Sequence, residues 1–288
     1  MTGDWQVVSG NRDKLGESPL WHPLERKLYW IDFYGPTVHR LDPADGSMTS
    51  WPVPGAELIG SLGFASGGRL MLATDRGLLL FEPAHGSVTP FADPNGGREA
   101  VGYNDSKVGR DGHYWVGTFD APESAPRGIL YSVEPSGRWA VADSGFIVCN
   151  GPAFSPDGGT LYFSDSMGKQ ILAYDVDAAR GRLSKRRLFA SIADGLPDGM
   201  TVDREGHLWC ALYSAGEVRR FRPDGAVSEI LALPVANVTS CCLGGDDLCT
   251  LYVTSGWTGA TSGKDLGGSL FSRRVGVPGL PEPVFSVR

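Results

Sequence analysis

The stretch Pro156-Asp-Gly-Gly-Thr-Leu-Tyr-Phe163 joins a tight turn to the start of a short β-strand. Asp-Gly and Gly-Gly pairs supply the backbone geometry of a hairpin turn, and the apolar and aromatic residues that follow favour a strand. A similar strand segment, preceded by a turn, occurs six times, at Lys27-Leu-Tyr-Trp30, Arg69-Leu-Met-Leu72, His113-Tyr-Trp-Val116, Thr160-Leu-Tyr-Phe163, His207-Leu-Trp-Cys210 and Thr250-Leu-Tyr-Val253. Counted from residues 28, 70, 114, 161, 208 and 251, the spacings are 42, 44, 47, 47 and 43 residues.

This period predicts the architecture. Repeats of this length, with three or four short strands in each, are typical of the blades of a β-propeller. Six repeats account for nearly all of the 288 residues. We therefore expect an all-β fold, a six-bladed β-propeller that forms a single domain over residues 1–288 with a central channel. A two-sheet sandwich or a double barrel is the alternative, but neither requires even spacing.

Composition and charge exclude several classes of function. The net charge is −7, without a run of like charges, so the chain lacks the basic surface that binds nucleic acid or anionic membranes. The N-terminus has no signal-peptide pattern, and no segment approaches about 18 apolar residues. The five cysteines have neither CxxC spacing nor clustered histidines, so they indicate no disulfide framework or zinc site. We expect a cytoplasmic protein that binds neither nucleic acid nor membrane; its oligomeric state stays open.

Four repeats carry an oxygen-bearing side chain at an equivalent position. Ten or eleven residues before the repeated strand stand Glu17, Asn104, Asn150 and Asp198. In a propeller the innermost strand of each blade lines the channel, so these side chains would converge there. Each one alone could be a turn or capping residue, since Asn-Gly and Asp-Gly are common turn pairs. Four such residues at the same position of the repeat favour a shared site.

The other two repeats have Gly60 and Ser240-Cys241 at this position, so the site would be open on one side. Two carboxylates and the amide oxygens would repel one another unless a cation lay between them, and an all-oxygen set suits a hard divalent ion. Incomplete ligation by protein leaves positions for water or substrate, as a catalytic metal requires.

These residues lie in segments that resemble the regucalcin (senescence marker protein), gluconolactonase and luciferin-regenerating enzyme family. The resemblance covers nearly the full chain. It rests on Leu15-Gly-Glu-Ser-Pro-Leu-Trp21, Leu28-Tyr-Trp-Ile-Asp32, Asn104-Asp-Ser-Lys-Val108, Gly112-His-Tyr-Trp-Val-Gly-Thr118, Asn150-Gly-Pro-Ala-Phe-Ser-Pro-Asp-Gly158 and Pro197-Asp-Gly-Met-Thr-Val-Asp203. It implies a six-bladed propeller with one divalent metal cation (Ca²⁺, Zn²⁺, Mn²⁺, Mg²⁺ or Fe²⁺) held by the residues that match Glu17, Asn150 and Asp198.

The resemblance also implies hydrolysis of a small-molecule sugar lactone (an aldonolactone), with Asn104 contacting substrate or metal-bound water. Many members carry Arg two residues before this Asn to hold substrate hydroxyls, whereas this chain has Gly102, so neither the preferred sugar nor its ring size carries over. A Glu that touches substrate in some members falls in the region Phe119-Asp-Ala-Pro-Glu-Ser124, where either Asp120 or Glu123 could serve.

Lactone hydrolysis passes through a tetrahedral oxyanion that a divalent cation stabilises. We expect the metal to polarise the lactone carbonyl while Asp198 accepts the proton of the attacking water and Asn104 orients the substrate. A metal-bound hydroxide that Asp198 only steers is the other possibility.

Three other functions stay open. The same metal would serve another esterase or a phosphotriesterase. A non-enzymatic calcium-binding regulator would need six to eight oxygen ligands. An interaction propeller would show Gly-His and Trp-Asp pairs together, and this repeat has no Trp-Asp pair. The segment Ser255–Gly268, with Trp257, lacks strand patterning and could line the mouth of the pocket.

Overall fold

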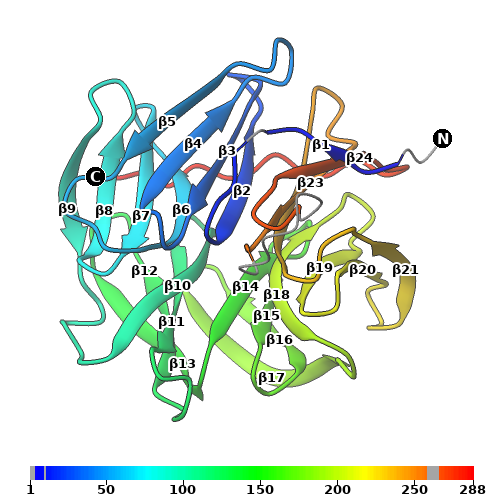
Figure 1. The fold of residues 1–288 in the computed structure, drawn as a ribbon. Coiled ribbons are helices and arrows are strands. Elements are labelled where there is room, and N and C mark those ends of the chain that lie inside the picture. The colour runs from blue at the N-terminus through cyan, green and yellow to red at the C-terminus, as the bar shows by residue number, and fades with distance from the viewer. Residues whose placement is uncertain (1–3, 10, 258–265) are drawn as a thin grey trace.

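The computed structural model describes residues 4–9, 11–257 and 266–288. The described residues form 24 β-strands in six four-stranded antiparallel sheets, and they contain no helix. The sheets are arranged as blades around a channel (Figure 1). The innermost strands of neighbouring blades contact one another all the way round, through the pairs β2–β6, β6–β10, β10–β14, β14–β18, β18–β22 and β22–β2. The expected all-β, six-bladed β-propeller is confirmed.

Five blades are formed by four consecutive strands, running from the channel outward. The first contains β2 (Gly16–His22), β3 (Lys27–Asp32), β4 (Thr37–Leu41) and β5 (Met48–Pro52). The second contains β6 (Ile59–Ala65), β7 (Arg69–Thr74), β8 (Gly77–Glu82) and β9 (Ser87–Ala92). The third contains β10 (Val101–Val108), β11 (Tyr114–Asp120), β12 (Gly128–Val133) and β13 (Trp139–Phe146). The fourth contains β14 (Cys149–Phe154), β15 (Thr160–Asp165), β16 (Gln170–Asp177) and β17 (Arg182–Ser191). The fifth contains β18 (Leu196–Val202), β19 (Leu208–Tyr213), β20 (Glu217–Phe221) and β21 (Val227–Ala232).

The sixth blade joins the two ends of the chain. Its three inner strands are β22 (Val238–Gly244), β23 (Thr250–Ser255) and β24 (Phe271–Arg274), and its outermost strand is β1 (Gln6–Val7). Gln6 pairs with Ser272 and Val7 with Phe271. The indole N–H of Trp5 adds a hydrogen bond of 2.7 Å to the carbonyl of Ala232 in the fifth blade. The ring is therefore closed by a strand from the opposite end of the sequence.

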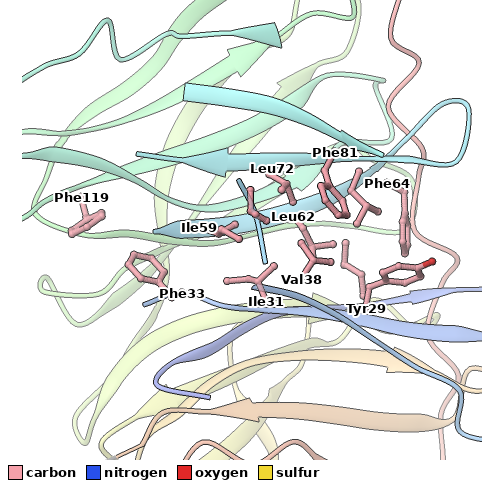
Figure 2. Packing of buried hydrophobic residues seen from close by; sticks show 13 residues of the cluster. Tyr29, Ile31, Phe33, Val38, Ile59, Leu62, Phe64, Leu72, Phe81 and Phe119 are labelled. Atoms are coloured by element: carbon pink, nitrogen blue, oxygen red, sulfur yellow. The ribbon is translucent and has the colours of Figure 1, made fainter. Parts of the chain in front are cut away.

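The six repeated strands of the sequence are the second strands of the six blades, in which nearly every residue is buried. Trp30, Trp115 and Trp209 are fully buried there. Each indole N–H reaches an aspartate, at 2.8 Å to Asp13, 3.3 Å to Asp111 and 2.9 Å to Asp203, so burial leaves none of these three tryptophan donors unpaired. Figure 2 shows the hydrophobic cluster between the first and second blades, to which Tyr29, Ile31, Phe64, Leu72 and Phe81 belong.

Every innermost strand is irregular at one equivalent place. The pairing register shifts between Glu17 and Leu20, and in the other five blades between Ile59 and Ser61, Tyr103 and Ser106, Asn150 and Ala153, Pro197 and Met200, and Val238 and Cys241. A bulge in an antiparallel pair bends the strand and changes where a side chain points. Each blade thus has one position at the channel where the bulge changes the direction of the side chain.

The last residues of the chain cross the far end of this channel. The N–H of Arg204 bonds the carbonyl of Pro278, and the N–H of Ser66 bonds that of Phe285, so the segment touches blades on opposite sides. Lys107, near the end of β10, forms a buried ion pair of 2.7 Å with Glu282 of this segment. The bulges lie near the start of the inner strands, which leaves that end of the channel for a site.

Candidate metal centre

The structure brings the four predicted residues together. Glu17, Asn104, Asn150 and Asp198 come from β2, β10, β14 and β18, and all four line one open cavity of about 390 Å³. The side chains of Glu17, Asn150 and Asp198 are buried, with residue exposures of 8%, 8% and 7%. The cavity is lined in addition by Lys14, Leu15, Phe33, Tyr34, Phe119, Glu123, Val148, Ser166, Met167, Leu196, Tyr213 and Trp257.

A chain of hydrogen bonds fixes the two amides. Asn104 donates through Nδ2 to Oδ1 of Asn150 (2.5 Å) and to the carbonyl of Cys149 (2.9 Å). Asn150 donates through its own Nδ2 to the hydroxyl of Ser166 (3.0 Å), which donates to the carbonyl of Pro197 (2.6 Å). The amide of Asn150 is therefore oriented from both sides, and the third, fourth and fifth blades are linked at the channel.

Left-handed backbone follows two of the site residues. Ser18 has φ = 50° and Gly151 has φ = 46°, each directly after a site residue and inside the bulge. The N–H of Ser18 turns back to bond Oε2 of Glu17 at 3.1 Å. A Cβ on Gly151 would lie 2.4 Å from the carbonyl oxygen of Asp198, so only glycine lets the fourth and fifth blades approach this closely.

A third carboxylate lies beside the predicted ones. Asp105 is buried, and it accepts backbone hydrogen bonds from Ser106 (2.7 Å) and from Gly151 (2.8 Å). The sequence alone assigns this residue no role, because an aspartate beside an asparagine is typical of a turn. Its bond to Gly151 ties the third blade to the bulge in β14 that carries Asn150.

The electrostatics of the centre are those of crowded acids. Burial, and then the charges of Asp198 and Asp105, raise the pKa of Glu17 well above its usual value. Burial and the Asp105 charge likewise raise the pKa of Asp198 well above its usual value. Among the described residues, Oδ1 of Asp198 is buried without any hydrogen-bond partner. A buried carboxylate oxygen that lacks a donor, in a set of oxygen ligands, fits a hard divalent cation.

Another acidic cluster is a poorer metal site. Asp203, Glu205 and His207 bring ligand atoms close together in the turn between β18 and β19. However, Arg220 already contacts Asp203 at 2.7 Å and Glu205 at 2.8 Å. The other oxygen of Asp203 accepts the N–H groups of Glu205 and His207. The guanidinium takes the place that a cation would need.

The structure distinguishes the two acids that the sequence left open. Asp120 is fully buried, forms an ion pair with Arg127 and accepts the N–H groups of Ser124 and Ala125. These contacts outweigh burial and lower the pKa of Asp120, which fits a structural role. Glu123 instead lines the cavity.

The positions without an oxygen ligand are places of close packing. A Cβ on Gly60 would lie 2.5 Å from the carbonyl oxygen of Tyr103, so the second blade has no room for a side chain there. Ser240 packs against Gly199, directly after Asp198. Trp257 lines the cavity, whereas residues 258–265 of the same segment lie outside the described residues.

In the part of the chain that the structure describes, no helix is long and apolar enough to cross a lipid bilayer.

Known proteins match this chain over most of its length. The family model described as the SMP-30/Gluconolactonase/LRE-like region matches residues 15–256. A 6-deoxy-6-sulfogluconolactonase of Pseudomonas putida is 36% identical over 279 residues, which cover 94% of this chain and 95% of that protein. The pentonolactonase XacC of Haloferax volcanii is 32% identical over 282 residues, which cover 93% of this chain and 94% of that protein. A crystal structure of a calcium-binding protein, regucalcin, from Agrobacterium tumefaciens superposes with a TM-score of 0.89 at 27% identity. The superposition covers 97% of this chain and 96% of that chain. With its six blades and the four oxygen-bearing side chains that converge on the channel, the chain belongs to the SMP-30/gluconolactonase/LRE-like family.

Proposed function

We propose that the protein is a metal-dependent hydrolase of sugar lactones, with one divalent cation bound by Glu17, Asn150 and Asp198. The observation that carries the proposal is the buried, unpartnered Oδ1 of Asp198 at the base of an open cavity. The names of the relatives, a sulfogluconolactonase and a pentonolactonase, support lactones as the substrate class.

The three ligands come from blades on different sides of the channel, and Asn104 and Ser166 hold the Asn150 amide from its two ends. Oxygen ligands suit Ca²⁺, Mg²⁺ and Mn²⁺ best, while Zn²⁺ and Fe²⁺ are tested beside them. When bound, a divalent cation in this place would supply a Lewis acid for the lactone carbonyl and for the oxyanion that hydrolysis produces.

The other steps fall to the side chains around the cavity. Asp198 accepts the proton of the attacking water. Its buried, acidic surroundings raise the pKa of this carboxyl in the metal-free centre, and coordination to a cation would lower that pKa again. Asn104 orients the lactone beside it. Burial, and then the carboxylate of Asp198, raise the pKa of the Tyr213 hydroxyl, so this side chain stays protonated and can donate a hydrogen bond to a substrate oxygen.

The test is hydrolysis of five- and six-carbon aldonolactones by metal-stripped protein, with each of the five ions restored in turn. We expect turnover that returns with a metal, and an Asp198→Asn variant in which turnover is lost. Metal binding by this variant, followed by calorimetry, separates the role of Asp198 as a base from its role as a ligand. Wild-type protein that binds a metal but hydrolyses no lactone would contradict the proposal.

The same experiment distinguishes the alternatives. Tight Ca²⁺ binding without turnover of any ester would favour a calcium-binding regulator, a protein closer in kind to the calcium-binding regucalcin from Agrobacterium tumefaciens. Turnover of phosphotriesters rather than lactones would favour another hydrolase on the same metal. A cytoplasmic location stays a prediction from sequence.

A further inference from the structure

The cavity has two chemically different sides. The fourth and fifth blades contribute polar groups, from Asn150, Ser166, Asp198 and Tyr213. On the side of the second blade, the rings of Phe33, directly after β3, and Phe119, in β11, form an apolar wall. The polar residues Glu17, Tyr34, Asn104 and Glu123 line the cavity beside this wall. A substrate in this cavity therefore meets hydrocarbon at the wall and hydrogen-bonding groups around it.

The two phenylalanines meet over the second blade. Phe33 belongs to the first blade and Phe119 to the third, yet their ring centroids are 5.9 Å apart in an edge-on arrangement. The N–H of Ile59, at the start of β6, bonds the carbonyl of Phe33 at 3.1 Å. Figure 2 shows Phe33 and Phe119 facing each other at one end of the cluster, with Ile59 next to them. Their rings cover the side on which the second blade brings no ligand to the centre.

Gly102 fixes the position of Phe119. The two residues pair across β10 and β11, and a Cβ on Gly102 would lie 2.5 Å from Cε1 and 3.0 Å from Cζ of the Phe119 ring. No side chain at position 102 can reach the cavity while Phe119 holds this place. The ring of Phe119 therefore fills the space beside the backbone of Gly102.

We propose, on the basis of the proposed lactonase function, that the preferred substrate is a deoxygenated sugar lactone. Its ring hydroxyls face the polar blades, and a methyl or methylene group in place of an exocyclic hydroxyl packs against Phe33 and Phe119. A hydroxyl against this wall loses its water partners without gaining a new one, which lowers kcat/KM by about fivefold or more. A methyl group gains about fourfold from its burial.

The test uses matched pairs of lactones that differ only at the exocyclic carbon. Metal-loaded wild-type protein is assayed with a six-carbon aldonolactone and its 6-deoxy counterpart, and with a five-carbon aldonolactone and its 5-deoxy counterpart. We expect kcat/KM to favour the deoxy member by at least about tenfold. Equal rates, or preference for the hydroxylated member, would overturn this inference and leave the lactonase proposal intact. If neither pair is hydrolysed, both fail.

Three variants assign the preference to the wall. Phe119→Ser supplies a hydroxyl and space, so the deoxy preference should fall to within about threefold. Phe119→Leu keeps the position apolar and should keep the preference. Phe81→Leu makes the same change in a buried residue of the same cluster that does not line the cavity, and it controls for loss of packing. A folded Phe119→Ser protein with the wild-type preference would overturn the assignment. Should it not fold, Phe119→Tyr, which adds a hydroxyl to the same ring, takes its place: a smaller preference than in Phe119→Leu would support the role of the ring, and an equal preference would refute it.

Discussion

Replacing Asp198 by Asn tests the electrostatic account of the centre. In the metal-free protein this carboxylate is buried near Asp105, with one oxygen unpartnered. The charge of such a buried, unpaired carboxylate costs at least about 1–3 kcal/mol, and the neutral amide of Asn removes it. For 288 residues the unfolding entropy is about 0.6 kcal/mol per degree. We therefore expect Asp198→Asn to raise the Tm of the metal-free protein by about 2–5 °C.

The pH dependence of this effect has a definite sign. Because the pKa of Asp198 is raised in the folded state, the folded protein binds more protons than the unfolded chain between the usual and the raised pKa. Metal-free wild-type protein should therefore lose stability as the pH rises through this window, and Asp198→Asn should lose less. The advantage of the variant is thus largest at neutral and alkaline pH.

Metal should reverse the comparison. A ligand at about 100 times its Kd stabilises the folded state by about 2.7 kcal/mol, which corresponds to about 4–5 °C for this chain. Wild-type protein should show this shift and Asp198→Asn should show little of it. The assay is thermal unfolding followed by circular dichroism at several pH values, with chelator and with each ion.

Asp120→Asn is the matched control, because Asp120 has a cationic partner in Arg127 and a lowered pKa. Its stabilising effect is present above the usual pKa of an aspartate and is lost as the pH falls through the lowered value. This variant should be less stable than wild type at neutral pH. A lower metal-free Tm for Asp198→Asn, with a wild-type response to metal, would refute the reasoning.

Three further predictions concern the surroundings of the centre. Ser166→Ala removes the acceptor that orients the Asn150 amide, so metal affinity measured by calorimetry should fall about 10–100-fold; unchanged affinity would show that the amide needs no such support. Glu282→Gln leaves Lys107 buried without its ion partner and should lower the unfolding free energy by about 3 kcal/mol in a denaturant titration. Glu205→Gln is the exposed control, and equal unfolding midpoints for Glu282→Gln and wild type would contradict this prediction. Four of the five cysteines are buried, and burial raises the pKa of their thiols, whereas Cys249 is partly exposed. A thiol reagent should therefore label at most one cysteine in native protein and five after unfolding, and rapid labelling of several cysteines in native protein would contradict the packing.

The architecture was predictable because each blade repeats one buried hairpin. The anchors at Leu28 and Leu161 fall in second strands, where burial on both faces imposes apolar and aromatic residues. The site followed from the same periodicity, since bulges at one phase bring Glu17, Asn150 and Asp198 to the channel. Their roles in binding metal and in catalysis stay predictions.

Other features leave no periodic trace. The strand β1 has only two residues, too few for a strand pattern, and it is defined by its pairing with β24. The importance of Asp105 depends on a hydrogen bond to Gly151 in another blade, which local sequence does not encode. The apolar wall depends on the contact between Phe33 and Phe119, two residues from different blades. In each case the decisive partner is remote in the chain.

The closure of the ring by β1 has a mechanical consequence. The seam of the propeller lies within the sixth blade, where β1 pairs with β24 before the chain continues into the strand that carries Glu17. Asn150 and Asp198 lie on the other side of the channel, so a cation held by all three residues would brace the ring across its seam. During synthesis this seam stays open until β24 has emerged and paired with β1. Binding of the ion and closure of the ring would therefore stabilise each other. The proposed metal centre would in this way also stabilise the fold of the propeller.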